Sequence, residues 1–254
     1  MLLALAAPLP AVDMLYVTMN NNTIVSYDTT GNNGSTIAAS VATFASTNLS
    51  SPNGLAFDSS GNLYAANYGN NTISKFNASG GYVSNITTNV NGPTDLAFDS
   101  SGNLYAANYG SSSTISKFNS AGTFLSRINS NLSGPVGLAF DSTGNLYASN
   151  SGDNTISKFN SAGTYLSQIN SNLNFPYGLA FDSSGNLYAS NIADNTISKF
   201  NSSGTFLTSW GTGAAPGYLA FKPVSVPEPS TYALATIATG VMAYLARRRK
   251  ARTA

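Results

Sequence analysis

The chain has 254 residues, of which 8% are charged, and it contains neither histidine nor cysteine. These absences exclude histidine-based catalytic triads, thiol nucleophiles and the common zinc sites. Between residues 14 and 221, four lysines and one arginine stand against eight aspartates. That segment lacks the basic surface from which nucleic-acid binding draws most of its affinity, so no nucleic-acid partner is expected.

Residues 1–12 are interpreted as a remnant of a secretory signal peptide or a degenerate one. The segment from Met1 to Ala7 is short and apolar, and Ala11 provides a candidate cleavage edge. The basic start of an ordinary signal peptide is missing, so either the start of the chain is wrong or the signal is degenerate. We therefore expect an exported protein whose folded part spans residues 14–222.

A block of about 41 residues repeats almost verbatim through this folded part. Its marker is the segment Gly-Leu-Ala-Phe-Asp-Ser-Ser-Gly-Asn-Leu-Tyr, followed in each copy by Thr-Ile-Ser-Lys-Phe-Asn; the aspartates of the four copies are Asp58, Asp99, Asp141 and Asp182. Each block holds four short apolar runs that are separated by turns rich in Asn, Asp, Ser and Gly, which is typical of a four-stranded meander. The sequence therefore predicts an all-β propeller.

The two ends of the repeat array determine the predicted number of blades. Residues 15–44 match only the second, third and fourth strands of a block, and residues 217–221 match only the first. Pairing these two ends would close the ring and leave no exposed edge strand. We therefore predict five four-stranded blades, or six if the true start of the chain lies upstream.

The blocks resemble the NHL-repeat propellers over residues 15–221. The resemblance rests on the pattern Pro-x-Gly-Leu-Ala-Phe-Asp-x-x-Gly-Asn-Leu-Tyr-Ala and on the Asn-x-Ile-x-Lys-Phe segment after it. Many NHL repeats carry an arginine before the isoleucine of the third strand, where this chain has Thr72, Thr114, Thr155 and Thr196. The resemblance implies the propeller fold, and the missing arginines argue against the nucleic-acid role of basic family members.

The composition changes abruptly in residues 223–254. A motif at residues 226–231 (Val226, Pro227, Glu228, Pro229, Ser230 and Thr231) is followed by an apolar segment at residues 230–246 and by the basic residues Arg247, Arg248, Arg249, Lys250 and Arg252. The apolar segment predicts a short transmembrane helix, and the basic run is expected to remain in the cytoplasm.

The order of these three parts resembles the PEP-CTERM sorting signal of Gram-negative bacteria. The resemblance implies recognition by an exosortase and cleavage near Pro227, Glu228 and Pro229. It also implies an inner-membrane-anchored precursor that is released to the cell surface or to a polysaccharide-rich extracellular matrix.

Candidate ligand-binding residues lie where the blocks differ from one another, in the loops of one propeller face. They are Tyr68, Tyr109, Asp153 and Asp194 between the second and third strands, and Asp95, Tyr177 and Trp210 between blades, alongside Thr94 and Phe175. Asp95 replaces the glycine of the other blocks near the expected channel mouth. Aromatic rings of this kind can stack on sugars while Asp and Asn bond hydroxyl groups. The alternative is that these rings cover blade edges or seams.

Residues that repeat in every block are interpreted as parts of the blades. Asp58 and its equivalents are predicted to cap hairpin turns, because the loop is too short for a calcium site and lacks its later glutamate. The repeated lysines, such as Lys75, are expected to be solvated strand residues. No metal site and no cofactor are predicted.

These observations favour an exported, non-enzymatic binding or structural module of the cell envelope or extracellular polysaccharide matrix. Its expected partners are the exosortase and either extracellular polysaccharide or envelope proteins. The alternative is a lactonase-like propeller hydrolase or lyase with a channel-mouth site around Asp95. A third reading, ice binding, lacks the regular threonine ladder that it requires.

Overall fold

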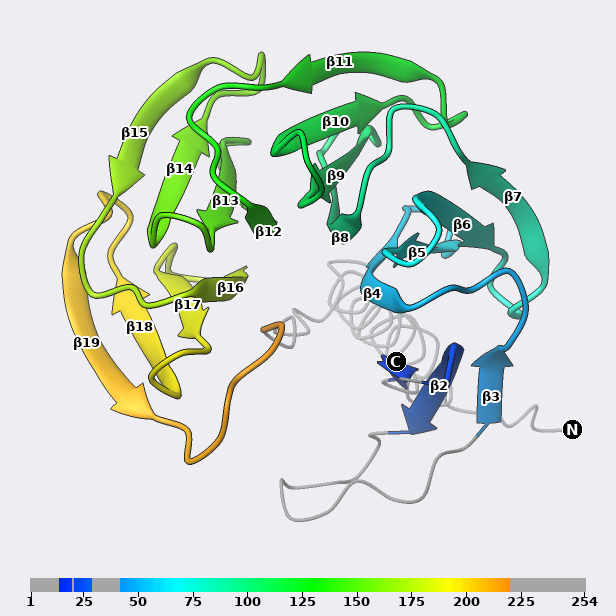
Figure 1. Cartoon of the computed structure of the whole chain (residues 1–254), viewed down its shortest axis with the longest axis horizontal. Helices are drawn as coiled ribbons and strands as arrows, with labels where there is room; N and C mark the ends of the chain where they lie inside the picture. Colours follow the sequence, from blue (N-terminus) through cyan, green and yellow to red (C-terminus); the bar gives the residue numbers. More distant parts are fainter. Residues whose placement is uncertain (1–13, 20, 29–41, 220–254) are drawn as a thin grey trace, which may run out of the picture. The chain divides into compact units, whose positions relative to one another are not determined.

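The computed structural model describes residues 14–19, 21–28 and 42–219. They form five antiparallel sheets around a central axis, like the blades of a propeller (Figure 1). The first sheet contains β1 (Met14–Met19), β2 (Thr23–Asp28) and β3 (Ala42–Ala45). The next two contain β4 (Pro52–Phe57), β5 (Leu63–Asn67), β6 (Thr72–Phe76) and β7 (Tyr82–Ile86), then β8 (Pro93–Phe98), β9 (Leu104–Asn108), β10 (Thr114–Phe118) and β11 (Phe124–Ile128). The last two contain β12 (Pro135–Phe140), β13 (Leu146–Asn150), β14 (Thr155–Phe159) and β15 (Tyr165–Ile169), then β16 (Pro176–Phe181), β17 (Leu187–Asn191), β18 (Thr196–Phe200) and β19 (Phe206–Gly211).

The structure confirms the predicted all-β propeller, with five blades among the described residues. Four blades are four-stranded meanders, and the first blade has three strands among the described residues. The predicted closing strand at residues 217–221 is only partly described. Residues 217–219 are not in a strand, but Ser190 Oγ donates a hydrogen bond of 2.7 Å to the carbonyl oxygen of Gly217 and so ties this segment to β17. Its pairing with β1 stays a prediction.

The predicted signal remnant at residues 1–12 and the sorting signal at residues 223–254 lie outside the described residues. The same holds for the transmembrane helix predicted at residues 230–246. Within the described part of the chain, no helix has the length and apolar character needed to cross a membrane.

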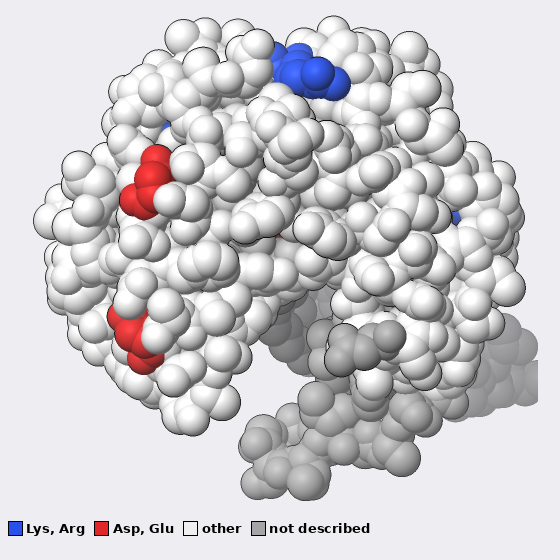
Figure 2. Space-filling view, viewed as in Figure 1, with Lys and Arg blue, Asp and Glu red and all other residues white. Residues whose placement is uncertain are grey.

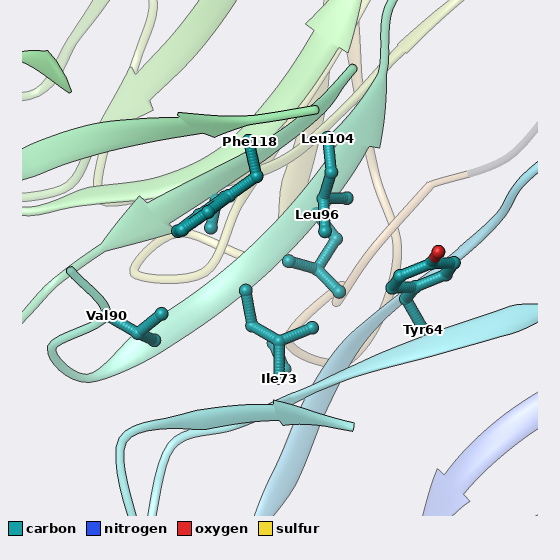
Figure 3. Close-up of a cluster of buried hydrophobic side chains, with 8 residues drawn as sticks. Tyr64, Ile73, Val90, Leu96, Leu104 and Phe118 are labelled. Carbon is teal, nitrogen blue, oxygen red and sulfur yellow. The ribbon is translucent and has the colours of Figure 1, made fainter. Parts of the chain in front are cut away.

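The core lies between neighbouring blades. All five residues of β5, β9 and β13 are buried, although successive side chains of a strand point to opposite faces of its sheet. Each face must therefore pack against a different neighbour. Figure 3 shows one such seam, in which Tyr64 and Ile73 of one blade face Leu96 and Phe118 of the next. No blade can bury its apolar surface alone.

The turn at Asp58 is a cap, as predicted. The Asp58 carboxylate accepts hydrogen bonds from the backbone N–H groups of Ser60 and Asn62, both at 2.9 Å, and Gly61 between them has a φ of 78°. Such a tight turn requires a residue that tolerates positive φ. The equivalent aspartates of the other three blocks make the same bonds.

The repeated lysines differ from the expectation that they are simply solvated. Lys75 Nζ lies 3.5 Å from Asp58 Oδ2 and 4.9 Å from the centre of the Tyr64 ring. Partial burial alone would lower the pKa of Lys75, but Tyr64 and Asp58 together hold it above its ordinary value. The same ion pair and cation–π contact recur at Lys117, Lys158 and Lys199. In the four four-stranded blades, these lysines connect the third strand to the turn between the first and second strands.

Replacing a buried aromatic side chain should destabilise the propeller far more than replacing an exposed side chain on an outer strand. Phe159 ends β14 with no exposed surface, so we expect Phe159→Ala to lower the free energy of unfolding by about 3–5 kcal/mol. Leu166 on the neighbouring strand β15 is 48% exposed, and Leu166→Ala should change it by less than about 0.5 kcal/mol. Urea denaturation measures both changes in the free energy of unfolding. Equal changes would contradict a core that lies between neighbouring blades.

Candidate functional site

The innermost strands of the blades approach one another closely around the channel. Each of the inner strands β4, β8, β12 and β16 begins with a proline, and its pairing with the next strand shifts in register just after that proline. Such a shift is typical of a β-bulge, which changes the direction of the side chains that follow. At the third position stand Gly54, Gly137 and Gly178. A Cβ atom on Gly178 would lie 2.6 Å from the Cα atom of Tyr218, and one on Gly137 would collide with the carbonyl oxygen of Tyr177. Only glycine allows this approach.

Two blades depart from glycine at this position, and both departures bring chemistry to the channel. In β8 the third residue is Asp95, and in the segment after β19 the register Pro216-Gly217-Tyr218-Leu219 places Tyr218 there. These two departures from glycine bring a carboxyl group and a phenol to the channel.

Asp95 is buried, with 8% of its surface exposed, and its carboxylate joins two blades. Oδ1 accepts a hydrogen bond of 2.9 Å from the backbone N–H of Leu96, and Oδ2 accepts one of 2.8 Å from the N–H of Leu138 on β12. Burial raises the pKa of Asp95 from 3.8 to about 7, although the two N–H donors act in the opposite direction. A carboxyl group with this pKa changes its protonation state near neutrality.

In the next two blades, a serine of the second strand makes the connection that Asp95 makes between β8 and β12. Ser149 Oγ accepts from the N–H of Gly137 at 2.8 Å and donates to the carbonyl oxygen of Tyr177 at 2.6 Å. The residue equivalent to Ser149 in β9 is Ala107, which cannot do this. There Thr94 Oγ1 donates to the carbonyl oxygen of Val136 at 3.0 Å, beside the Asp95 bond to Leu138. Thr94 and Asp95 thus form the blade connection that serine makes elsewhere.

Two tyrosines reach across the channel to blades that are not their neighbours. The Tyr177 hydroxyl lies within hydrogen-bonding distance of the Asn53 side chain, at 3.3 Å from Nδ2 and 3.4 Å from Oδ1. The Tyr218 hydroxyl donates to the carbonyl oxygen of Thr94 at 2.6 Å. The two rings are 4.9 Å apart and tilted by 59°. Burial and the nearby Asp95 carboxylate raise the pKa of Tyr218 well above its ordinary value, so its hydroxyl stays a donor.

A cavity of about 510 Å³ lies beside these side chains in the channel. Its walls are Tyr16, Val17, Thr18, Asn53, Gly54, Leu55, Asp95, Leu96, Leu138, Leu179, Tyr218 and Leu219. Asp95 is the one carboxyl group in this lining, and most of the wall is apolar. In the described part of the chain, no three acidic side chains come together in a way that could hold a metal ion.

Tyr68 and Tyr109 lie outside the cavity, on loops of one face. They follow β5 and β9 and are 45% and 39% exposed. An edge atom of the Tyr68 ring is 3.3 Å from the place a Cβ atom would take on Gly92, and Tyr109 lies against Gly134 in the same way at 3.1 Å. Each ring therefore rests on the glycine that leads into the next blade and remains partly exposed to solvent.

The remaining candidates lie outside the cavity, with Asp153 and Asp194 on the β13–β14 and β17–β18 loops. Asp153 and Asp194 each accept a hydrogen bond of 2.7 Å from a threonine two residues later, as Asn70 does from Thr72 at 2.8 Å. Trp210, expected in a loop between blades, lies on the outer strand β19 with its ring 6.0 Å from that of Tyr188. The structure therefore brings Asp95 and Tyr177 to the channel and leaves the others elsewhere.

Sequence reasoning missed Tyr218 and Asn53 as channel residues. The signal for Tyr218 was present, because Pro216-Gly217-Tyr218-Leu219 aligns with Pro-x-Gly-Leu and differs at its third residue, as Pro93-Thr94-Asp95-Leu96 does. No local signal marks Asn53, because its partner Tyr177 lies 124 residues away.

Asp95 should make the stability of the fold depend on pH. The folded pKa is about 7 and the unfolded value about 4, so the folded state holds a proton that the unfolded state releases between these values. Stability is therefore fully present below about pH 4 and is lost as pH rises to about 7. Relative to the Asp95→Gly variant, which restores the glycine of other blades, the wild type should lose about 2–4 kcal/mol over this window.

Urea denaturation at several pH values between 4 and 8 provides the measurement. The hydrogen bonds lost in the variant change its free energy of unfolding by the same amount at every pH. The readout is therefore the difference between the two proteins in how this free energy varies with pH. Parallel pH profiles for the two proteins would show that Asp95 titrates normally.

Comparisons with known proteins agree with this geometry at the level of the fold. Residues 11–106 match the family described as the SMP-30/Gluconolactonase/LRE-like region, and residues 225–250 match the PEP-CTERM protein-sorting motif. None of the curated proteins matches the chain. The propeller implied by the NHL resemblance is confirmed, while the matching family model is of the gluconolactonase-like type.

Solved structures with a similar fold include two lyases and a lactonase. A streptogramin B lyase is 20% identical over 66% of this chain and 58% of its own, with a TM-score of 0.59. The chain thus spans little more than half of that lyase. A gluconolactonase from Xanthomonas campestris is 19% identical, with coverages of 80% and 73% and a TM-score of 0.65.

A third similar structure is a catalytically inactive histidine-to-alanine variant of virginiamycin B lyase from Staphylococcus aureus with quinupristin. It is 15% identical, with coverages of 85% and 76% and a TM-score of 0.63. At such identities the likeness establishes the fold alone. The chain is thus a five-bladed β-propeller in which residues 11–106 match the SMP-30/Gluconolactonase/LRE-like region, and it carries a C-terminal PEP-CTERM protein-sorting motif.

Proposed function

We propose that this protein is an exported, non-enzymatic module that binds neutral polysaccharide of the cell envelope or extracellular matrix. The observation that carries the proposal is the face bearing Tyr68 and Tyr109, where half-exposed rings lie among asparagine, serine and glycine loops. Few charged side chains appear on the surface in Figure 2. Aromatic rings beside amide and hydroxyl groups suit a ligand that is apolar on its ring faces and hydroxylated at its edges.

The channel favours a non-enzymatic role over catalysis. The similar lyase loses its activity when one histidine is replaced, and this sequence contains no histidine. The cavity offers one carboxyl group, and the described residues hold no acidic cluster for a metal ion. Asn53, Thr94, Asp95, Tyr177 and Tyr218 are all engaged in hydrogen bonds of the fold itself. Their arrangement is accounted for by these contacts between different parts of the propeller.

The C-terminal motif supports export through a membrane-anchored precursor. Residues 225–250 match the PEP-CTERM motif, and Glu228 lies within that match. Recognition by an exosortase follows from this motif. Cleavage near Glu228 and delivery to an extracellular matrix belong to the proposal.

Co-sedimentation with the exopolysaccharide of the producing organism tests the proposal. We expect wild-type protein to bind and the Tyr68→Ala/Tyr109→Ala variant to bind at least about fivefold more weakly, because each ring contributes about 0.5–1.5 kcal/mol. Tyr165→Ala is the matched control, since Tyr165 is a half-exposed ring on the outer strand β15. No binding by folded wild-type protein would sink the proposal.

A lactonase-like hydrolase is the second candidate, and Asp95 is the observation that favours it. A buried carboxyl with a pKa of about 7 is suited to general acid–base catalysis, and similar propellers include a gluconolactonase. The test measures hydrolysis of aldonolactones with and without added divalent cations. We expect no turnover by the wild type above that of Asp95→Gly. Turnover that this variant abolishes would replace the binding proposal with the hydrolase.

A further inference from the structure

Three consecutive seams on the loop face each carry one aromatic ring, but the rings come from two different loops. At the first two seams, Tyr68 covers Gly92 and Tyr109 covers Gly134. At the third seam, between β12–β15 and β16–β19, the residue equivalent to Tyr109 is Ser151 and the residue equivalent to Gly134 is Phe175. The ring and the small residue have exchanged places, so the seam still has one ring.

The backbone around these rings is the same at all three seams. The N–H of Gly92 donates to Asn71 Oδ1 at 2.6 Å, and the N–H of Phe175 donates to Asn154 Oδ1 at 2.7 Å. At the middle seam the N–H of Gly134 donates to Ser113 Oγ at 3.1 Å. Phe175 therefore presents its ring from a loop that is anchored like its glycine counterparts.

Phe175 is an unfavourable residue for this backbone. Its φ is 52°, close to the 56° of Gly92 and the 57° of Gly134, in the left-handed region that bulky side chains rarely adopt. The ring is also 39% exposed, so burial recovers only part of what a fully packed phenylalanine would gain. Glycine occupies this position at the first two seams, and the small residue Ser51, with a φ of 46°, occupies it before β4. A strained, exposed ring of this kind indicates a role outside the fold.

The surroundings of these rings favour a neutral, hydroxylated ligand. The four repeated lysines pair with aspartates at the opposite ends of the blades, at the β4–β5 type of turn. Beside the first ring, Asn91 Nδ2 donates to the Ser111 hydroxyl at 3.3 Å in an exposed loop. Amide and hydroxyl groups of this kind suit sugar hydroxyls, whereas no cationic cluster accompanies the rings within the described residues.

We propose that the three seams are three equivalent subsites, each of which stacks one sugar ring of a neutral polysaccharide on Tyr68, Tyr109 or Phe175. This inference rests on the proposed binding function and specifies where the polysaccharide lies. Because the subsites share one rigid body, their individually weak contacts add up through multivalency. The channel, with Tyr177 and Tyr218 crossing it, takes no part in this binding.

The experiment exchanges the ring at the third seam between its two loops. Phe175→Gly should reduce binding to the exopolysaccharide of the producing organism about fivefold, with an unchanged or higher Tm because glycine relieves the backbone. The double variant Ser151→Tyr/Phe175→Gly reproduces the Tyr109–Gly134 arrangement and should restore binding to within about twofold of the wild type. Tyr165→Ala serves again as the control for a ring outside the seams.

The outcomes separate this inference from the proposed function. If Phe175→Gly binds like the wild type while Tyr68→Ala/Tyr109→Ala does not, the binding function stands and the three-subsite inference fails. A lower Tm in Phe175→Gly that the double variant restores, without a change in binding, would identify the ring as seam packing. Failure of the wild type itself to bind would reject both.

Discussion

The structure depends on one constraint: a blade whose central strand is buried on both faces must pack between two neighbours. The strands β5, β9 and β13 have no exposed residue, so each blade gains its stability only at its seams. The inner strands must then approach one another closely. Gly137 and Gly178 permit this approach, and a Cβ atom on Gly178 would collide with the backbone of Tyr218 in the segment after β19.

Packing between identical seams has a consequence for function. A position at a seam is displayed several times around one face, whereas a position that departs from the repeat is displayed once. Asp95 and Tyr218 are of the second kind, and their polar groups are bonded to other blades. Tyr68 and Tyr109 stand at equivalent positions of two successive blocks, where the other two blocks have Ser151 and Ile192, and they are 45% and 39% exposed. The exposed rings at the seams are the better binding surface, whereas the hydrogen-bonded side chains of Asp95 and Tyr218 are better suited to holding the propeller together.

The sequence predicted the features that depend on short segments of the repeat and on its period. The cap at Asp58 and the five-blade count follow from turn chemistry and period, and Asp95 was singled out because it interrupts a run of glycines. Contacts between distant blades were not predictable, because the bond from Tyr218 to Thr94 exists only once the ring has closed. The stacking of Lys75 over Tyr64 was missed since it depends on cross-strand register, in which Tyr64 stands opposite Lys75.

The central claim is that the ligand lies on the seam rings and not in the channel. Nuclear magnetic resonance of protein with isotope-labelled tyrosine and phenylalanine rings, titrated with fragments of the producing organism's exopolysaccharide, tests this most directly. The account predicts shifts of the Tyr68, Tyr109 and Phe175 signals, while those of Tyr177 and Tyr218 stay in place. Shifts confined to the two channel tyrosines would contradict it and would direct attention to the cavity beside Asp95.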